Sequence, residues 1–381
     1  MKGRSVFTGK PVEIRWDGGR LTQVEEVGED ADLPWVSPGF LDIQVNGFLG
    51  SEYNLPNFDI THAKAITGHL AKSGTTRHIP TICTSPAEVI IRNLKILAEL
   101  REKDRDFSYA VPGIHIEGPF ISGEDGPRGA HDRSYVRDPD WGEFQEWQAA
   151  AKGLIKIVTL APERKGAIRF IEKLAAEGVI PAIGHCAADP ETIRRAVDAG
   201  AKFSTHLGNG SALMVPRLKN WIWEQLAIDE LCAGVISDGF HLPESVLKVF
   251  YRAKGRNRII LVSDVSLCGG YKPGLYKSAN IDVEVFPDGH LGLPGTTILA
   301  GAAHLLDWDI PVFMKAAGVS LGEAIRLCTQ NPAKLLNIQT PMLEAGDPAD
   351  LVFFRHSSPV KALEIEAVYR EGKKISDGKT E

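Results

Sequence analysis

The sequence lacks any segment that would direct the chain into a membrane. Its first twenty residues, MKGRSVFTGKPVEIRWDGGR, have no apolar core of the signal-peptide kind, and no hydrophobic run approaches the length of a membrane span. Cysteine is scarce too: the five cysteines are scattered and none has CxxC spacing. Such a distribution favours reduced thiols over a disulfide framework. We therefore expect a soluble, cytoplasmic protein.

Charge of one sign is not concentrated anywhere in the sequence. The 43 basic and 49 acidic residues give a formal net charge of −6, and the sequence pI is near 6.0. This balance gives no electrostatic reason to expect nucleic acid or an anionic membrane as a partner. Low-complexity linkers and short-period repeats are also missing. What the chain does have is 381 residues, 43% of them hydrophobic, which is enough for a large core in one or more domains.

One unit recurs along the chain: a short apolar run, then polar or glycine residues, then a helical pattern. Between two of these runs, PETIRRAVDAG has Asp189 as its expected N-cap, Pro190 at the first helical position, and Gly200 at its end. Eight strand–helix alternations favour a parallel (β/α)8 TIM-like barrel, with an open α/β sheet as the alternative. The eight runs begin at Gly39, Thr75, Val111, Ile155, Gly178, Ala201, Ala233 and Arg258.

Both ends of the chain resemble short strands instead of strand–helix units. Residues 1–37 contain strand-like pieces around the turn signal DGGR, and the C-terminal part contains LEAGDPADLVFF and VKALEIEAVYREGKKI. We predict that residues 1–37 and 344–381 combine into a small β-sandwich domain. Residues 38–343 would then form the catalytic barrel.

Several of the predicted strands end in a residue suited to metal chemistry. The third run ends at Glu117, the fifth at His185, the sixth at His206, the seventh at His241 and the eighth at Asp264. Because the carboxyl ends of barrel strands meet at one rim, these side chains should converge there. Small residues follow both His185 and His206 and leave room for a ligand.

Each of these residues also has an ordinary structural interpretation. A lone histidine at a strand end is more often a hydrogen-bonded structural residue than a ligand, and Asp264 alone could be an N-cap. Five such groups among eight strand ends are much less expected by accident. Glu117, His185 and His206 supply three N/O ligands and leave a position for water, as a catalytic zinc site requires. Asp264 would then act as the general base.

Nine motifs spread over essentially the whole chain carry a family resemblance. They are PGFLDIQVNG, IHIEGPF, LAPE, GHCAAD, THLGNG, SDGFHL, LVSD, NPAKLL and GDPADLVFF. In order and spacing they resemble the N-acetylglucosamine-6-phosphate deacetylases of the amidohydrolase superfamily. The resemblance implies a metal-dependent hydrolase in which Glu117, His185 and His206 hold one divalent metal, most often zinc. It also implies that Asp264 is the catalytic acid/base.

The first predicted strand departs from many members of that superfamily. They carry a His-x-His pair that binds another metal, whereas this chain has Gln44 and Asn46 at the corresponding positions. Amides are poor replacements for imidazole as transition-metal ligands. The Gln-x-Asn form also occurs in single-metal members of the deacetylase family. We therefore expect one metal per chain.

The same resemblance assigns three residues to the substrate. His131 matches a histidine that contacts the substrate and helps to polarise the acetyl carbonyl, and His241 matches one at the sugar-phosphate end. Arg217 matches an arginine that reaches the phosphate of the neighbouring subunit's substrate, which implies a homodimer. A guanidinium suits this role because it stays charged and offers a bidentate fork.

Two departures affect the substrate end of the site. The segment after His206 reads LGNGS, so that Asn209 and Gly210 are candidate substrate-binding residues but the family's aromatic and methionine walls are missing. After Arg217 the usual Glu-Pro-Gly is replaced, and Trp221 and Trp223 follow. These tryptophans add apolar surface near the expected phosphate end, or they pack at a helix or dimer contact.

Three functional interpretations follow from the sequence. The leading one is removal of the N-acetyl group from an amino sugar, foremost N-acetylglucosamine 6-phosphate, giving glucosamine 6-phosphate and acetate. A second keeps the same chemistry on another N-acyl substrate, such as an unphosphorylated or different amino sugar or an N-acyl amino acid. A third is a non-catalytic sugar-binding barrel, against which the intact set of ligands and Asp264 argues.

Overall fold

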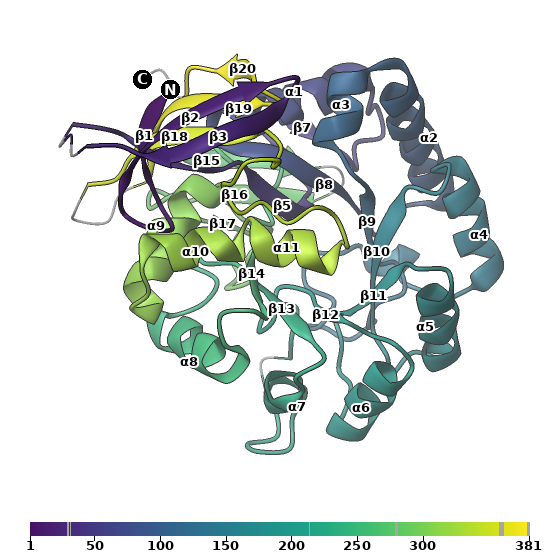
Figure 1. Ribbon diagram of the computed structural model, residues 1–381. Helices are drawn as coiled ribbons and strands as arrows, with labels where there is room; N and C mark the ends of the chain where they lie inside the picture. Colours follow the sequence, from purple (N-terminus) through teal and green to yellow (C-terminus); the bar gives the residue numbers. More distant parts are fainter. Residues whose placement is uncertain (29, 31, 213, 279–280, 358–361, 379–381) are drawn as a thin grey trace.

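Eight parallel strands surround the centre of the computed structural model (Figure 1), which describes residues 1–381 apart from 29, 31, 213, 279–280, 358–361 and 379–381. The first and last strands meet through a parallel bridge between Val45 and Val265, and the amide of Asp264 donates to the carbonyl of Gln44. The predicted (β/α)8 barrel is therefore confirmed. Its strands are β5 (Phe40–Val45), β8 (Thr75–Cys83), β9 (Ile114–Glu117), β10 (Ile155–Leu160), β11 (Ile180–Ile183), β12 (Phe203–Ser204), β13 (Cys232–Val235) and β14 (Ile259–Leu261).

Helices form the outer layer around the strands (Figure 1). The predicted start of α6 is confirmed: the Asp189 carboxylate accepts a hydrogen bond from the amide of Thr192, and Pro190 is the first helical residue. The helices are α1 (Ile60–Lys72), α2 (Ala87–Lys103), α3 (Arg105–Ala110), α4 (Trp141–Ala150), α5 (Ala167–Ala176), α6 (Pro190–Asp198), α7 (Trp221–Ala227), α8 (Glu244–Lys254), α9 (Leu306–Ala317), α10 (Leu321–Leu327) and α11 (Gln330–Leu335).

The barrel interior is a packed apolar core. Side chains from strands or strand ends on all sides meet there and are almost fully buried, among them Leu41, Ile79, Ile157, Phe203 and Ile260. A larger apolar cluster lies between the strands and the surrounding helices. Because successive strand residues point alternately inward and outward, one strand can serve both layers. This packing fixes the positions of the strand ends that carry the functional residues.

The two ends of the chain pair with each other in a second sheet. Antiparallel pairing of β4 with β18 joins N-terminal to C-terminal strands in one seven-stranded sheet, ordered β20-β19-β18-β4-β1-β2-β3 (Figure 1). Its buried side chains form an apolar cluster of their own. The division of the chain at residues 37/38 and 343/344 stays a prediction. The strands are β1 (Lys2–Ser5), β2 (Pro11–Asp17), β3 (Arg20–Glu26), β4 (Trp35–Pro38), β18 (Leu351–Arg355), β19 (Glu364–Arg370) and β20 (Lys373–Ser376).

Two small strand units follow the first and last barrel strands and were not predicted. A short hairpin of β6 (Gly47–Phe48) and β7 (Ser51–Glu52) follows β5. A three-stranded sheet of β15 (Gly274–Ser278), β16 (Ile281–Val285) and β17 (Leu291–Gly292) follows β14. Both units contribute side chains to the cavity at the barrel rim.

Membrane-spanning character is not found in the helices that the structure describes, since none of them is long and apolar enough to cross a bilayer. All five cysteines are free thiols, three of them buried.

Candidate active site

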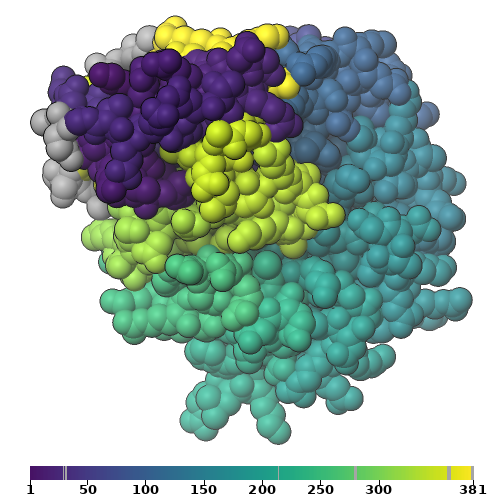
Figure 2. Space-filling view, in the orientation of Figure 1, coloured from purple at the N-terminus to yellow at the C-terminus, as the bar shows by residue number. Residues whose placement is uncertain are grey.

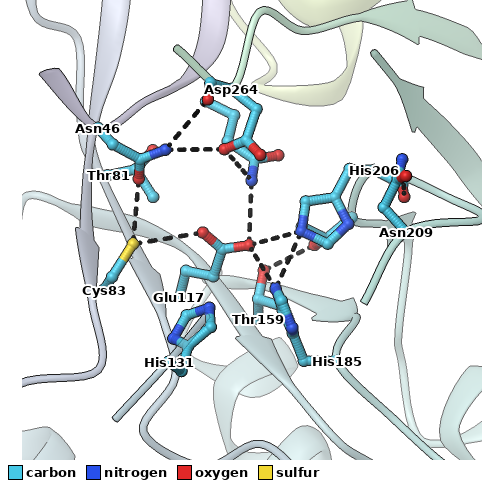
Figure 3. A network of polar contacts seen from close by, with 12 residues as sticks. Asn46, Thr81, Cys83, Glu117, His131, Thr159, His185, His206, Asn209 and Asp264 are labelled. Atoms are coloured by element: carbon cyan, nitrogen blue, oxygen red, sulfur yellow. Dashed lines mark hydrogen bonds and ion pairs between the residues drawn. The ribbon is translucent and has the colours of Figure 1, made fainter. Parts of the chain in front are cut away.

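A carboxylate and two imidazoles from the ends of β9, β11 and β12 meet at the carboxyl end of the barrel (Figure 3). Glu117 is the last residue of β9, and His185 and His206 lie two residues beyond β11 and β12. Oε1 of Glu117 lies 3.0 Å from Nε2 of His206 and 3.3 Å from Nε2 of His185, and the two Nε2 atoms are 3.0 Å apart. All three side chains are buried. The structure thus brings together the three residues that the sequence suggests as metal ligands.

The backbone is strained where these side chains enter the site. His185, His206 and Asp264 have φ values of 49°, 29° and 52°, in the left-handed region that non-glycine residues rarely adopt. Such a conformation costs about 1–2 kcal/mol per residue. Its occurrence at three strand ends around one cavity is typical of a functional site, where geometry is favoured over local stability.

The donor atoms of this cluster fit a divalent metal ion. Nδ1 of His185 lies 2.8 Å from the carbonyl oxygen of Pro127, which can only accept, so that Nδ1 carries the proton and the lone pair of Nε2 faces the cluster. Burial alone would raise the pKa of Glu117, but hydrogen bonds and charge from the two histidines hold it well below its usual range. An ionised carboxylate and an imidazole lone pair aimed at the same point are what a bound cation requires.

Asp264 lies beside this cluster and is held by two amides from the first barrel strand. Its Oδ1 accepts hydrogen bonds from Nε2 of Gln44 over 3.0 Å and from Nδ2 of Asn46 over 2.8 Å. The same nitrogen of Gln44 also lies 3.0 Å from Oε1 of Glu117. Burial, with a smaller contribution from the charge of Glu117, raises the pKa of Asp264 to about 6. A carboxyl group poised near neutral pH can both accept and return a proton.

His131 approaches the cluster from the loop that follows β9. Its Nδ1 lies 2.8 Å from Oγ1 of Thr84, and its ring meets the ring of His185 edge to face with centroids 4.4 Å apart. Burial and the neighbouring His185 lower the pKa of His131 to about 3, which makes it a neutral imidazole near pH 7. A neutral imidazole can donate one hydrogen bond to a ligand without carrying charge.

These groups line one cavity of about 580 Å³, a size typical of small-molecule sites. Asn209 and Gly210 also line it, as the sequence suggests. Gly210 has a φ of +56°, and a Cβ added there would lie 2.6 Å from Nδ1 of His185. Only glycine therefore lets the backbone approach the imidazole this closely.

His241 lines the cavity, as expected, but it does not lie at the end of a strand. The seventh strand, β13, ends at Val235, so His241 is not a strand-end residue but lies in the turn that follows. The Asp238 carboxylate forms this turn, since it accepts a hydrogen bond from the amide of His241 over 2.9 Å and contacts its Nδ1 at 2.7 Å. Asp238 was missed in the sequence, although its three-residue spacing to His241 was visible.

Arg217 and the two tryptophans lie away from this cavity. Arg217 is exposed on the segment that leads into α7, which projects from the lower edge of the molecule (Figures 1 and 2), and it is not among the described residues that line the cavity. Trp221 is buried in the core outside the barrel, and Trp223 is 49% exposed with its indole N–H directed at the Arg217 carbonyl over 3.4 Å. Neither tryptophan lines the described cavity, so helix packing is the interpretation that fits Trp221.

Cys83 contacts the cluster and was also missed. Its Sγ lies 3.0 Å from Oδ1 of Asn46 and 3.5 Å from Oε2 of Glu117 (Figure 3). Cys83 is the last residue of β8 and is paired in register with Glu117 on β9. The apolar run visible in the sequence stops one residue earlier, at Ile82, so the thiol that ends the strand falls outside the pattern.

Comparison with known proteins gives consistent matches over most of the chain. The model of the amidohydrolase family matches residues 35–375. The N-acetylglucosamine-6-phosphate deacetylase of Bos taurus is 33% identical over 343 residues, covering 87% of this chain and 82% of that protein. The enzyme of the same name from Bacillus subtilis is 31% identical over 319 residues, covering 83% of this chain and 79% of that protein.

A solved structure resembles this one over nearly its full length. It is a variant of N-acetyl-D-glucosamine-6-phosphate deacetylase from Mycobacterium smegmatis in complex with N-acetyl-D-glucosamine-6-phosphate. The two folds superpose with a TM-score of 0.87 at 27% identity, covering 96% of this chain and 94% of the other.

Proposed function

The chain belongs to the amidohydrolase family, and from that membership and its site we propose that it hydrolyses N-acetylglucosamine 6-phosphate to glucosamine 6-phosphate and acetate. The observation that carries the proposal is the buried cluster of Glu117, His185 and His206 with the Asp264 carboxyl beside it. The curated relatives of this name, at 30–33% identity over most of the chain, support the substrate.

The family is metal-dependent. Among the described residues, Glu117, His185 and His206 form the only group of three side chains close enough together to bind one metal ion. We propose one divalent ion per chain, zinc in the first place, held by Glu117, His185 and His206. When bound, it would polarise the scissile carbonyl and make a nearby water more acidic. Nitrogen and oxygen donors without cysteine are typical of a catalytic zinc site with an open position.

The protein's own residues would handle the protons. Asp264 accepts a proton from the attacking water and then delivers it to the departing amine nitrogen. Gln44 and Asn46 hold its Oδ1, which leaves Oδ2 for this transfer. If the hydroxyl of Thr84 donates to Nδ1 of His131, the proton of that imidazole resides on Nε2, from where it can donate to the carbonyl oxygen as charge develops.

The sugar would lie toward Asn209, Gly210 and His241. Asp238 holds the ring of His241 in the cavity wall, and the backbone around Gly210 comes close to His185. We propose that Arg217 binds the phosphate of a substrate held by a second copy of the chain, so that the working form is a homodimer. Its exposed, projecting position supports contact with a second copy better than contact with its own cavity.

The intact cluster argues against a non-catalytic sugar-binding protein, because binding alone does not need Asp264 next to three candidate ligands. We also propose a cytoplasmic location, which the five free thiols support. A hydrolysis screen of N-acetyl amino sugars with and without a 6-phosphate tests the proposed substrate. Preference for the 6-phosphate of N-acetylglucosamine supports it, and preference for another N-acyl compound contradicts it.

A further inference from the structure

A buried acidic side chain with a free oxygen faces the cavity on the side away from the proposed sugar position. Glu52, the last residue of β7, is only 7% exposed and lines the cavity. The hydroxyl of Ser278 donates to its Oε2 over 3.0 Å. Among the described residues, none donates to Oε1 and no basic side chain pairs with the carboxyl group. A carboxyl group buried without a cation is costly, which makes an unpaired one in a cavity a candidate for ligand contact.

Glu52 is the acidic group with spare hydrogen-bonding capacity in this part of the cavity, and two of its polar neighbours are already engaged. Asn54 is engaged, because its Oδ1 accepts from the amide of Cys83 over 2.6 Å. Thr84 is engaged with His131. The cavity lining also includes the apolar residues Pro56, Pro86, Val89, Ile281 and Val283.

The position of this chamber relative to the reacting groups follows from the metal cluster. Cys83 and Asn46 lie on one side of Glu117, and Asn209 lies on the other side, beyond His206 (Figure 3). The inference rests on the proposed function, in which the sugar lies toward Asn209 and the reacting carbonyl lies at the cluster. The acyl substituent, on the opposite side of the carbonyl carbon from the sugar nitrogen, then points toward Cys83 and Asn46. Glu52 lies on this side, because the amide of the next residue, Tyr53, donates to the Asn46 carbonyl over 2.9 Å.

We infer that this chamber is an acyl subsite in which Glu52, held by Ser278, selects an N-acyl group that carries a hydrogen-bond donor such as a hydroxyl on its second carbon. An unbranched apolar acyl group of the same size fits the walls but leaves the Glu52 oxygen without a partner. Such an unpaired polar group discriminates more strongly than a difference in size does.

The test compares three substrates that differ only in the N-acyl group of glucosamine 6-phosphate: acetyl, hydroxyacetyl and propionyl. At pH 8, the ratio of kcat/KM for hydroxyacetyl over propionyl should be about tenfold higher or more in wild type than in Glu52→Leu, the scale of one charge-assisted hydrogen bond. The ratio measured for Glu52→Leu shows how much the hydroxyacetyl and propionyl amides differ in reactivity when the Glu52 carboxyl group is absent. Glu52→Gln keeps the size and polarity of the side chain and therefore controls for misfolding of Glu52→Leu. It should lower the ratio by a smaller factor than Glu52→Leu does.

Glu284→Gln is the matched control, because Glu284 lies on β16 next to Val283 but does not line the cavity. Its ratio should equal that of wild type. Ratios that are unchanged in both Glu52 variants while the acetyl substrate is turned over would overturn the subsite and leave the proposed function standing. A wild type that hydrolyses none of the three substrates would overturn both.

Discussion

Gln44 donates a hydrogen bond from its side-chain amide to Oδ1 of Asp264 over 3.0 Å. It joins the first and last strands of the barrel at the rim. An amide at this position ties the proposed acid/base in place where a histidine would bind a metal. Nε2 of Gln44 lies within hydrogen-bond distance of the carboxylates of both Glu117 and Asp264. As a neutral donor, it stabilises the negative charge of both groups.

We therefore expect one equivalent of divalent metal per chain. Elemental analysis of protein loaded with excess zinc and then desalted should give a ratio near one. Removing the metal with a chelator should abolish activity and also lower the melting temperature, since an ion at a thousand times its Kd stabilises the folded state by about 4 kcal/mol. Two equivalents at full occupancy, or activity that survives complete removal, would contradict the assignment.

The strand pattern of the barrel could be predicted because most residues of each strand are buried, so that the strands are short, mainly apolar runs. Each of the eight runs overlaps a barrel strand, even β12, which has only two residues. The alternation of apolar and polar residues could not locate the turn after β13. In this turn His241 is positioned by the carboxylate of Asp238 and not by a strand. The run that starts at Ala233 continues to His241, six residues past Val235, where β13 ends. The sequence pattern alone therefore does not show where the strand stops.

The site could be predicted where one residue type signals one chemistry, as with the histidines. Glu52 and Ser278 could not be found in this way, because their importance depends on two small sheets that come together at the cavity. The alternation of Ile281, Val283 and Val285 in the sequence IDVEV was the available signal for the second of these sheets.

Replacing Asp264 by Asn should preserve the fold and the bound metal but reduce kcat by about 10²-fold or more, the usual scale for a general acid/base. The amide matches the carboxylate in size but cannot shuttle the proton. Metal content and thermal stability are measured on the same preparation as turnover. A variant that keeps its metal and a near wild-type rate would show that another group moves the proton.

Replacing Arg217 by Ala should reduce kcat/KM for the 6-phosphorylated sugar by roughly 10- to 150-fold, equivalent to about 1.5–3 kcal/mol for a charge-assisted contact. Hydrolysis of the matching unphosphorylated sugar should barely change. Lys219→Ala removes a neighbouring exposed cation and serves as the control. Equal losses on both sugars, or an equal loss in the control, would remove Arg217 from phosphate binding.

Glu52 should make stability depend on pH. Burial raises its pKa from 4.5 to about 7, so that between these values the folded state binds more protons than the unfolded state and loses stability as pH rises. Glu52→Gln removes this loss. At pH 8 the free energy of unfolding of the variant, measured by denaturant titration, should exceed that of wild type by up to about 3 kcal/mol, and this difference should vanish near pH 4. A constant difference at both pH values would contradict the buried, proton-binding state of Glu52.

The most direct measurement is the release of acetate from N-acetylglucosamine 6-phosphate by the purified, zinc-loaded protein, followed together with the appearance of the free amine. We expect one acetate and one glucosamine 6-phosphate per substrate consumed, no release after chelation, and recovery when zinc is restored. His206→Ala, which removes one ligand of the proposed site, should be inactive under the same conditions. Metal-loaded wild-type protein that is folded and yet releases no acetate would contradict the proposed activity.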